Sequence, residues 1–481
     1  MNTNPFLLDG RHVESSAVLD CRSPWPQKYS AVNPCIPTFS ASPEHARAAA
    51  QAAARVFPAM REMSRFKRSE ALCAISAGIA ERAEAIAASI RNEAGKPMAL
   101  ARLEVQRAAR TFQTAAEEAL RTPGEVVYPD REAHGEGKIG RIEYFPLGPI
   151  LGISPFNFPL NLVAHKVAPA LAAGCPIVIK PPPQAPSAAL ALGEIVLKSG
   201  FPPTALQVLP GEMETGQALC ACPEFAAVSF TGSAKAGWAI KHSALPRQKI
   251  LLELGGNAAL IVDRSADLEA AGTAVATAGY MYSGQICIKT QRVFVHREVA
   301  DEFERRLAGK ILSTVPVSDN PADENALVGP LIDSAAAGRI EAWLKSAESA
   351  GAHVLIRGER RSENLISPWL LEAVPTDQPL SCEEIFGPVV TMDAVKDFEE
   401  GIARANASKY GLQTSVFTGS LSSAECAYRE LECGAVLVNL PTTFRLDSQL
   451  YGGVKESGFG REGVAEVVRE FSQPKLLVVK P

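Results

Sequence analysis

The stretch PILGISPFNFPLNLVAHKVAPALAAGCPIVIK, residues 149–180, decides the fold. It opens and closes with short apolar runs, 149–154 and 175–180, whose length and composition are typical of buried strands. The apolar run between them, 160–173, is long enough for a helix. A strand, a helix and a strand in this order predict a β–α–β unit with two parallel strands.

The same alternation continues beyond this stretch. It predicts helices at 186–199, 214–221 and 234–242, and strands at 206–209, 226–231 and 249–253. Repeated units of this kind predict a doubly wound parallel sheet, which binds ligands outside the carboxyl ends of its strands. A second α/β region begins at residue 258, and its predicted strands are 292–296, 353–356, 389–394, 415–417 and 435–439.

The chain before the quoted stretch has two characters. Ser42 can cap the first of three predicted helices, which cover 44–56, 65–92 and 98–120. Two short β-rich runs then predict an exposed hairpin, and an apolar strand is predicted at the C-terminus; they are 125–129, 138–145 and 475–480. Because exposed strand edges commonly pair with other strands, we expect this hairpin to pair with the terminal strand or with another subunit.

Composition excludes several classes of protein. The 481 residues are 47% hydrophobic and 21% charged, which is ordinary for a soluble globular protein and excludes disorder, collagen and a coiled coil as the main organisation. The net charge of −5, with no basic half, argues against nucleic acid as a partner. The longest apolar stretch is too short for a membrane span and contains His165 and Lys166, so no membrane association is expected.

The 10 cysteines are scattered, with no CxxC pair, and the 7 histidines show no paired spacing. We therefore expect no metal site and mostly reduced, buried thiols. The N-terminus MNTNPFLLDG has no apolar signal segment. A cytoplasmic protein is the expectation, in which one thiol can still be a nucleophile.

Three motifs follow predicted strands: ISPFNFP (153–159), KPPP (180–183) and FTGSAKAG (230–237). The third runs from a strand through a turn into a helix, whose free N–H groups suit a pyrophosphate, although it is not the GxGxxG fingerprint. Taken alone, Asn157 equally fits a turn cap and Lys180 a solvated loop residue.

Four further motifs are LELGGN (252–257), SGQICI (283–288), EEIFGP (383–388) and YGGVKESG (451–458). Apolar neighbours of Glu253 would raise its pKa and make it a usable general base, although an exposed strand-end Glu fits as well. Cys287 can act as a nucleophile once it is a thiolate, but most single cysteines are structural. The other two motifs fit ordinary turns.

All seven motifs occur in one chain and in one order, and together they closely resemble the aldehyde dehydrogenase superfamily. The separation of Glu253 and Cys287, 287 − 253 = 34 residues, fits that family's LELGG and GQxC motifs. The resemblance implies that Cys287 attacks the aldehyde carbon, that Asn157 and the Cys287 backbone N–H form an oxyanion hole, and that hydride transfer leaves a thioester. Glu253 would then activate water to hydrolyse it.

The resemblance also implies three units. They are a doubly wound cofactor domain (residues 1–121 and 147–254), a second α/β catalytic domain (255–465) and a small β oligomerisation arm (122–146 and 466–481). Self-complementary pairing of the arm implies a homodimer or a homotetramer.

The implied cofactor is NAD or NADP. By resemblance, Lys180, Ser233, Glu384 and Phe386 contact it, and the neighbouring positions Ser154, Phe156, Pro183 and Gly232 complete the set. Strict NAD enzymes of the family usually carry Glu three residues after the Lys, where this chain has Pro183. Proline neither accepts bonds from ribose hydroxyls nor repels a 2′-phosphate, so we expect NADP to be tolerated.

Arg107 and Arg445 align with positions that line the family's substrate funnel. Two guanidinium groups there favour an aldehyde with a carboxylate, phosphate, phosphonate or sulfonate tail, although each could be a structural arginine. Relatives for phosphate or phosphonate aldehydes often carry Arg where this chain has Ile286. We therefore expect a small semialdehyde or hydroxyaldehyde as the small-molecule substrate, with Phe158 as an aromatic wall.

Two rival activities remain. The branch that transfers the acyl group to coenzyme A lacks the Glu found here at position 253. A non-catalytic protein reusing the scaffold would be expected to have lost Cys287, Glu253 or Asn157, and the sequence retains all three.

Overall fold

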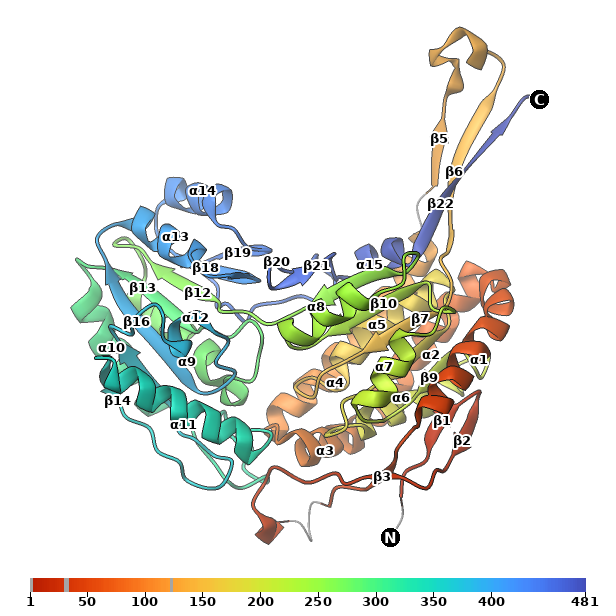
Figure 1. The fold of residues 1–481 in the computed structure, drawn as a ribbon. Coiled ribbons are helices and arrows are strands. Elements are labelled where there is room, and N and C mark those ends of the chain that lie inside the picture. The colour runs from red at the N-terminus through yellow and green to blue at the C-terminus, as the bar shows by residue number, and fades with distance from the viewer. Residues whose placement is uncertain (1–2, 30–33, 122–123) are drawn as a thin grey trace.

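The computed structural model describes residues 3–29, 34–121 and 124–481. Residues 122 and 123, at the predicted start of the arm, lie outside the described residues. Two α/β lobes lie side by side, and a long β arm projects from one of them (Figure 1). Within the described ranges, no helix combines the length and apolar character needed to cross a membrane.

The first lobe is built on an 8-stranded sheet. Its strands, in spatial order, are β2 (Arg11–Val13), β1 (Phe6–Leu8), β9 (Leu206–Val208), β8 (Ile177–Lys180), β7 (Ile150–Ile153), β10 (Ala227–Thr231), β11 (Lys249–Glu253) and β21 (Gly458–Phe459). The five strands from β9 to β11 are parallel, which confirms the predicted parallel sheet. Strand order reverses between β7 and β10, so a crevice for a ligand is expected at their carboxyl ends.

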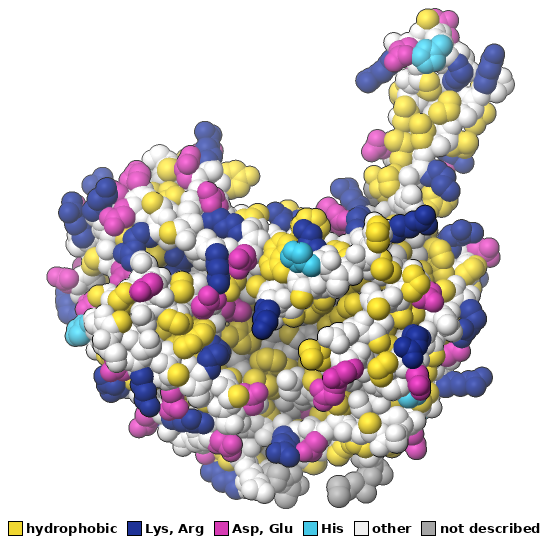
Figure 2. Space-filling view, viewed as in Figure 1, with side chains coloured by type: hydrophobic (Ala, Val, Ile, Leu, Met, Phe, Trp, Pro, Cys, Tyr) yellow, Lys and Arg dark blue, Asp and Glu magenta, His cyan; other side chains and the backbone are white. Residues whose placement is uncertain are grey.

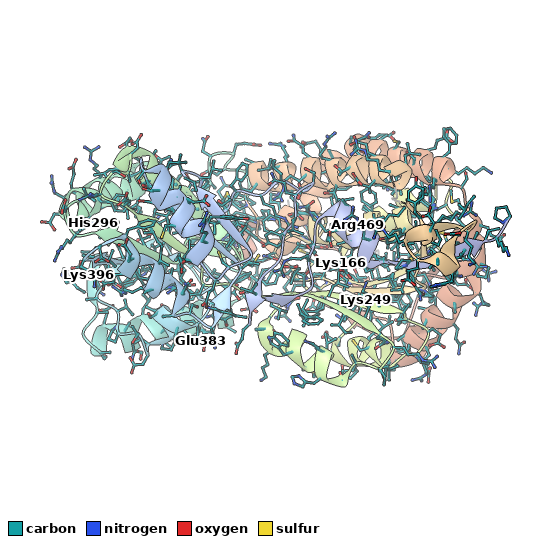
Figure 3. All side chains as sticks on the ribbon, turned by 90° about the horizontal axis from the view of Figure 1, so that it is seen from above. Lys166, Lys249, His296, Glu383, Lys396 and Arg469 are labelled. Atoms are coloured by element: carbon teal, nitrogen blue, oxygen red, sulfur yellow. The ribbon has the colours of Figure 1, made fainter. Side chains whose placement is uncertain are left out.

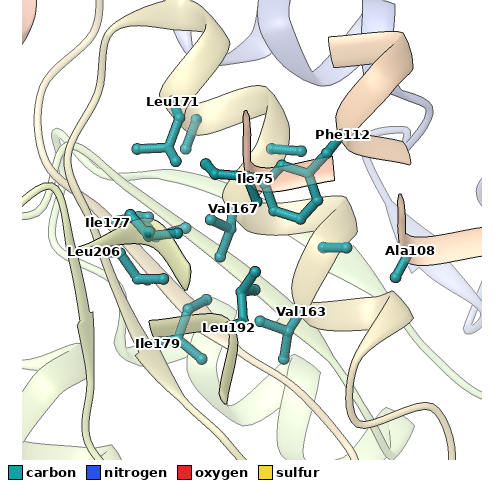
Figure 4. Close-up of a cluster of buried hydrophobic side chains, with 14 of the residues drawn as sticks. Ile75, Ala108, Phe112, Val163, Val167, Leu171, Ile177, Ile179, Leu192 and Leu206 are labelled. Atoms are coloured by element: carbon teal, nitrogen blue, oxygen red, sulfur yellow. The ribbon is translucent and has the colours of Figure 1, made fainter. Parts of the chain in front are cut away.

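Helices cover both faces of this sheet. One face packs against α2 (Arg65–Glu81), α4 (Met98–Arg121), α5 (Asn161–Ala173) and α6 (Ser187–Val196), and the other against α1 (Pro43–Glu62), α7 (Met213–Cys220) and α8 (Ala234–Ser243). Figure 4 shows the first of these cores, where Val163, Val167 and Leu171 of α5 meet Ile177 and Ile179 of β8. Because α5 is buried on every side, its polar residues lie inside the protein.

Two predictions for this lobe need correction. The predicted helix over 65–92 is two helices, α2 and α3 (Ala83–Ala94), because Arg82 leaves helical geometry with φ −101° and ψ 13°. Both helices pack on α4, and both also contact α6. The hairpin of β1 and β2 was not predicted, since three-residue strands are too short to show a clear alternation.

The second lobe contains a 7-stranded sheet. Its order is β14 (His353–Ile356), β15 (Trp369–Glu372), β16 (Val389–Val395), β13 (Arg292–His296), β12 (Ala259–Val262), β18 (Gln413–Phe417) and β19 (Ala435–Val438). The helices around it are α9 (Leu268–Tyr280), α10 (Ala300–Thr314), α11 (Ser334–Ser349), α12 (Pro379–Cys382), α13 (Phe398–Asn406) and α14 (Leu421–Glu430). The five predicted strands are present, and β12 and β15 are additional ones.

The arm is a three-stranded antiparallel sheet of β5 (Gly124–Val127), β6 (Ile139–Pro146) and β22 (Ser472–Val479). The terminal strand therefore pairs with the hairpin of its own chain. The last part of the chain also joins the two lobes, because β21 pairs with β11 and α15 (Val464–Glu470) packs on α5. Two short strands, β17 (Tyr410–Gly411) and β20 (Val454–Lys455), pair beside this crossing.

Candidate active site

Three segments bring the predicted catalytic residues to one place between the lobes. The turn between β7 and α5 carries Asn157, the end of β11 carries Glu253, and the segment between α9 and β13 carries Cys287. The first two lie at the carboxyl edge of the first sheet, where the reversal of strand order places a ligand crevice.

A strained turn presents Cys287. Tyr282 and Ser283 have φ values of +53° and +56°, in the left-handed region, and Gly284 follows at +70°. A Cβ on Gly284 would lie 2.2 Å from the Gly387 carbonyl oxygen, so only glycine fits there. The Cys287 Sγ lies 3.3 Å from the Tyr451 hydroxyl. Burial raises the pKa of the thiol to about 11, so Cys287 is a thiol at neutral pH before substrate arrives.

Asn157 faces the Cys287 segment. Its buried Nδ2 donates to the Gln285 carbonyl oxygen at 2.9 Å, two residues before the nucleophile. An amide nitrogen carries two hydrogens, so one remains for a second acceptor. The turn after β7 is therefore held against the nucleophile segment with a donor to spare.

Glu253 is buried at the lobe junction. Burial, with the negative charge of Glu462 second, raises the pKa of Glu253 well above its usual value. Its Oε2 has no hydrogen-bond partner among the described residues. Gly452 has φ +142° and a Cβ there would lie 2.8 Å from Glu253 Oε1, so this glycine makes room for the carboxyl group. Glu253 is thus a buried acid with a free oxygen.

A small cavity, about 70 Å³, opens onto Cys287. All four residues predicted to contact substrate line it: Arg107, Phe158, Ile286 and Arg445. Asn157, Tyr451, Lys96 and Glu104 also line it. Three of the seven motifs, those that contain Asn157, Cys287 and Tyr451, therefore meet at this cavity.

The two arginines of this cavity are held by buried carboxylates. Arg107 binds Asp447 in a bidentate manner, Nε to Oδ2 at 3.0 Å and Nη2 to Oδ1 at 2.8 Å. Arg445 Nη2 lies 3.2 Å from Glu462 Oε2, and its guanidinium stacks 3.6 Å above the Tyr451 ring. The Arg445 Nε is buried without a hydrogen-bond partner among the described residues, which leaves a donor for another ligand.

Sequence reasoning missed the groups behind the cavity. His165 Nε2 lies 2.8 Å from Asp447 Oδ1, and Lys166, inside the first lobe (Figure 3), lies 3.2 Å from Glu462 Oε1. A signal was present, because His and Lys side by side in a buried apolar helix need partners. Nothing in the sequence linked Asp447 and Glu462 to them.

Most of the residues predicted to contact the cofactor lie at or just after the carboxyl ends of strands in the first sheet, and Glu384 and Phe386 come from the second lobe. Phe156 and Phe386 pack edge to face with ring centroids 6.0 Å apart, and Ser233 caps α8 by accepting from the Ala236 N–H at 3.4 Å. Gly232 precedes this cap, and Pro183 lies at the surface beside the end of β8. The set comes from four separate segments of the chain.

Burial affects three of these positions. The buried Ser154 Oγ has no hydrogen-bond partner within the described residues. Burial lowers the pKa of Lys180 to about 8 and raises that of Glu384 to about 7. Of the described residues, no group of three or more His, Cys, Asp or Glu could hold a metal ion.

Comparisons with known proteins agree with this geometry. The model of the aldehyde dehydrogenase family matches residues 16–477, so the chain belongs to that family. It is an NAD(P)-dependent aldehyde dehydrogenase, as its relatives and solved neighbours are.

The most similar relatives include 3-sulfolactaldehyde dehydrogenase of Priestia aryabhattai, 37% identical over 417 residues (86% of this chain, 87% of that protein). Sulfoacetaldehyde dehydrogenase of Neptuniibacter caesariensis is 38% identical over 419 residues (87% and 91%). Among solved structures, aldehyde dehydrogenase 21 from Physcomitrella patens, in complex with the reaction product succinate, has a TM-score of 0.94 and 37% identity (99% and 98% covered). An NADP-dependent glyceraldehyde-3-phosphate dehydrogenase from Bacillus halodurans, complexed with NADP, has a TM-score of 0.93 and 32% identity (100% and 99%).

Proposed function

We propose that this enzyme oxidises a small aldehyde with an anionic or polar tail to the free carboxylate, by covalent catalysis at Cys287 and hydrolysis with Glu253 as base. The observation that carries the proposal is the buried cavity in which Arg445, with an unpaired Nε donor, lies together with Cys287. A buried donor of this kind is satisfied by a substrate oxygen.

The geometry supports each step of the reaction. The Cys287 thiol loses its proton to water, and its sulfur adds to the aldehyde carbon while the free hydrogen of Asn157 Nδ2 and the Cys287 backbone N–H stabilise the negative oxygen. Lys180, Ser233, Glu384 and Phe386 would hold a nicotinamide nucleotide, which when bound would supply the hydride acceptor needed to oxidise the thiohemiacetal at Cys287 to a thioester. Glu253 then takes a proton from water, and the hydroxide releases the carboxylate.

Charge in the cavity favours an anionic tail. Arg107, Arg445 and Lys166 carry three positive charges, whereas Asp447 and Glu462 carry two negative ones. Burial raises the pKa of Glu253, which favours its neutral form, and whenever Glu253 is neutral one positive charge of this network is left without compensation. A carboxylate or sulfonate on the substrate would balance it.

The names of the relatives support the same class. They include enzymes for sulfolactaldehyde, sulfoacetaldehyde, aspartate semialdehyde and lactaldehyde, all with anionic or hydroxyl groups. A semialdehyde or hydroxyaldehyde is our first candidate. A sulfonate aldehyde is the second, favoured by the relatives named for sulfolactaldehyde and sulfoacetaldehyde. Phosphate and phosphonate aldehydes remain the less favoured alternative because Ile286 is apolar.

The test compares succinate semialdehyde, sulfoacetaldehyde and neutral butanal with wild-type enzyme, Arg445→Met and Arg107→Met. Losing a charge-assisted bond costs about 1.5–3 kcal/mol, so kcat/KM for the anionic substrates should fall roughly 10- to 150-fold, and much less for butanal. Arg110→Met, an exposed arginine on α4, is the matched control. Equal losses on all three substrates would refute selection of an anion. Adding coenzyme A and finding an acyl-CoA product would overturn hydrolysis.

We further propose that the chain forms a homodimer or homotetramer through its arm and acts in the cytoplasm. Exposed apolar side chains on the arm support assembly through it. The absence of disulfide bonds among the ten cysteines supports a cytoplasmic location. The assembly experiment is given in the Discussion.

A further inference from the structure

A buried ion pair lies beside the catalytic cavity and takes no part in the reaction steps above. Lys96, in the turn between α3 and α4, pairs with Glu104, on α4. Both side chains are 1% exposed or less. Replacing a buried pair with apolar residues is often neutral or stabilising, so the fold alone does not explain why charges are kept here.

Glu104 holds the start of α5. Its Oε1 accepts from the Leu160 N–H at 2.9 Å and from the Asn161 N–H at 3.1 Å. Helix α5 begins after Leu160, whose side chain has no acceptor for these donors. The carboxylate of a neighbouring helix therefore supplies the missing cap, and its charge favours the positive end of α5. Asn157 lies only three residues before Leu160.

Lys96 joins this turn to the nucleophile segment. Its ammonium lies 3.6 Å from the ring centroid of Phe158 and 4.5 Å from that of Tyr282. Phe158 follows Asn157 directly, and Tyr282 begins the left-handed turn that leads to Cys287. The Tyr282 hydroxyl donates to the Ala94 carbonyl oxygen at 2.8 Å. Because Ala94 lies two residues before Lys96, this hydrogen bond also holds the Tyr282 ring against the segment that carries Lys96.

We propose that Lys96 and Glu104 are positioning residues that hold the Asn157 turn against the Cys287 segment, so that the oxyanion donor and the nucleophile meet at one carbonyl group. The inference rests on the proposed roles of Asn157 and Cys287. One cation contacts an aromatic ring from each segment, and its carboxylate partner fixes the backbone immediately after Asn157. A displacement of about 1 Å in such a constellation can cost roughly 100-fold in rate.

The principal variant is the double substitution Lys96→Met/Glu104→Leu, which removes both charges and keeps apolar volume. We expect it to melt cooperatively and to bind NADH with a Kd within twofold of wild type. Its kcat should fall at least tenfold, and the primary deuterium isotope effect on kcat, measured with aldehyde deuterated at C1, should rise as hydride transfer becomes limiting. Lys96→Arg keeps the cation and should retain kcat within about threefold. The matched control is Lys310→Met/Glu269→Gln, which removes a far more exposed ion pair. This control should change neither kcat nor the isotope effect.

If the double variant does not fold, Lys96→Met/Glu104→Gln serves, because the glutamine Oε1 can still accept from both N–H groups and no unpaired charge stays buried; the same rise in isotope effect is expected with a smaller loss of kcat. A purely structural pair would give unchanged kcat in the folded double variant, or a loss of kcat matched by equal losses in NADH binding, and either result overturns the inference. The proposed function fails separately, if wild-type enzyme does not oxidise aldehydes or Cys287→Ala remains active.

Discussion

Glu253 and Glu462 belong to one buried network, but their pKa values are shifted in opposite directions. Burial, with the charge of Glu462 second, raises the pKa of Glu253. Burial would raise that of Glu462 too, but Lys166 and Arg445 override it and lower the pKa to about 2. Glu462 is therefore ionised at neutral pH, whereas burial favours the protonated form of Glu253, which becomes a base only as the pH rises through its raised pKa.

This difference gives a prediction for Glu253→Gln. Glutamine cannot take a proton from water, so the variant should release one NAD(P)H per active site in a burst and then stall as the Cys287 thioester. Steady-state turnover should fall by about 100-fold or more, within the range of lost general base catalysis. Intact-protein mass spectrometry should find the acyl group on Cys287.

The pH dependence is the control for that experiment. Wild-type deacylation should increase with pH as Glu253 ionises, whereas the residual deacylation of Glu253→Gln should lose this limb and follow hydroxide alone. A variant that turns over at the wild-type rate with an unchanged pH profile would show that another group is the base.

Residues within a motif could be predicted from sequence, and residues that act across the fold could not. Asn157, Glu253 and Cys287 each stand in a short pattern whose neighbours define a turn or strand end. Asp447 and Glu462 acquire their partners only because the chain after β19 crosses back to the first lobe and places them against α5. Their local sequence contains no trace of that packing.

At the scale of elements, the β–α–β period predicted that strands β7 to β11 occur along the chain with helices between them, because each element there is an apolar run. It missed the break at Arg82, since both helices keep a helical pattern through it. The periodic pattern also did not predict β21, which is only two residues long. Its pairing with β11 depends on the path of the chain back to the first lobe.

The end of β8 gives a prediction about cofactor choice. Pro183→Glu would restore a carboxylate near the adenosine ribose, where it can accept hydroxyl bonds and repel a 2′-phosphate. We expect kcat/KM with NADP to fall about tenfold relative to that with NAD, which corresponds to about 1.4 kcal/mol of repulsion. Wild-type enzyme should use both nucleotides.

Gln184→Glu is the control, because it adds the same charge at the next, exposed position. Binding of 2′-AMP and 5′-AMP by calorimetry separates affinity from turnover. A ratio of NADP to NAD efficiency that stays within twofold in Pro183→Glu would place the ribose elsewhere.

At the scale of the whole molecule, the arm is the part whose apolar side chains stay exposed in a single chain. Leu476, Leu477, Val478 and Val479 of β22 are 45–55% exposed, and successive residues of a strand point to opposite faces. The arm therefore presents apolar side chains on both faces. Figure 2 shows hydrophobic side chains along the side of the arm that is in view. Its outer strands β5 and β22 and the edge strand β19 of the second sheet also have open edges.

These surfaces predict that the enzyme assembles through the arm. Leu476→Lys/Leu477→Lys places one charge on each face while leaving the backbone pairing of β22 with β6 intact, so each subunit should fold. Burying two lysines in an apolar contact costs several kcal/mol, so the assembly should dissociate to a smaller species at micromolar concentration.

Light scattering after size-exclusion chromatography measures the mass, with Gln473→Lys, on the same exposed strand, as control. A wild-type monomer, or a double variant with the wild-type mass, would mean that the arm has another role, since apolar surface on both faces of a sheet requires a partner of some kind.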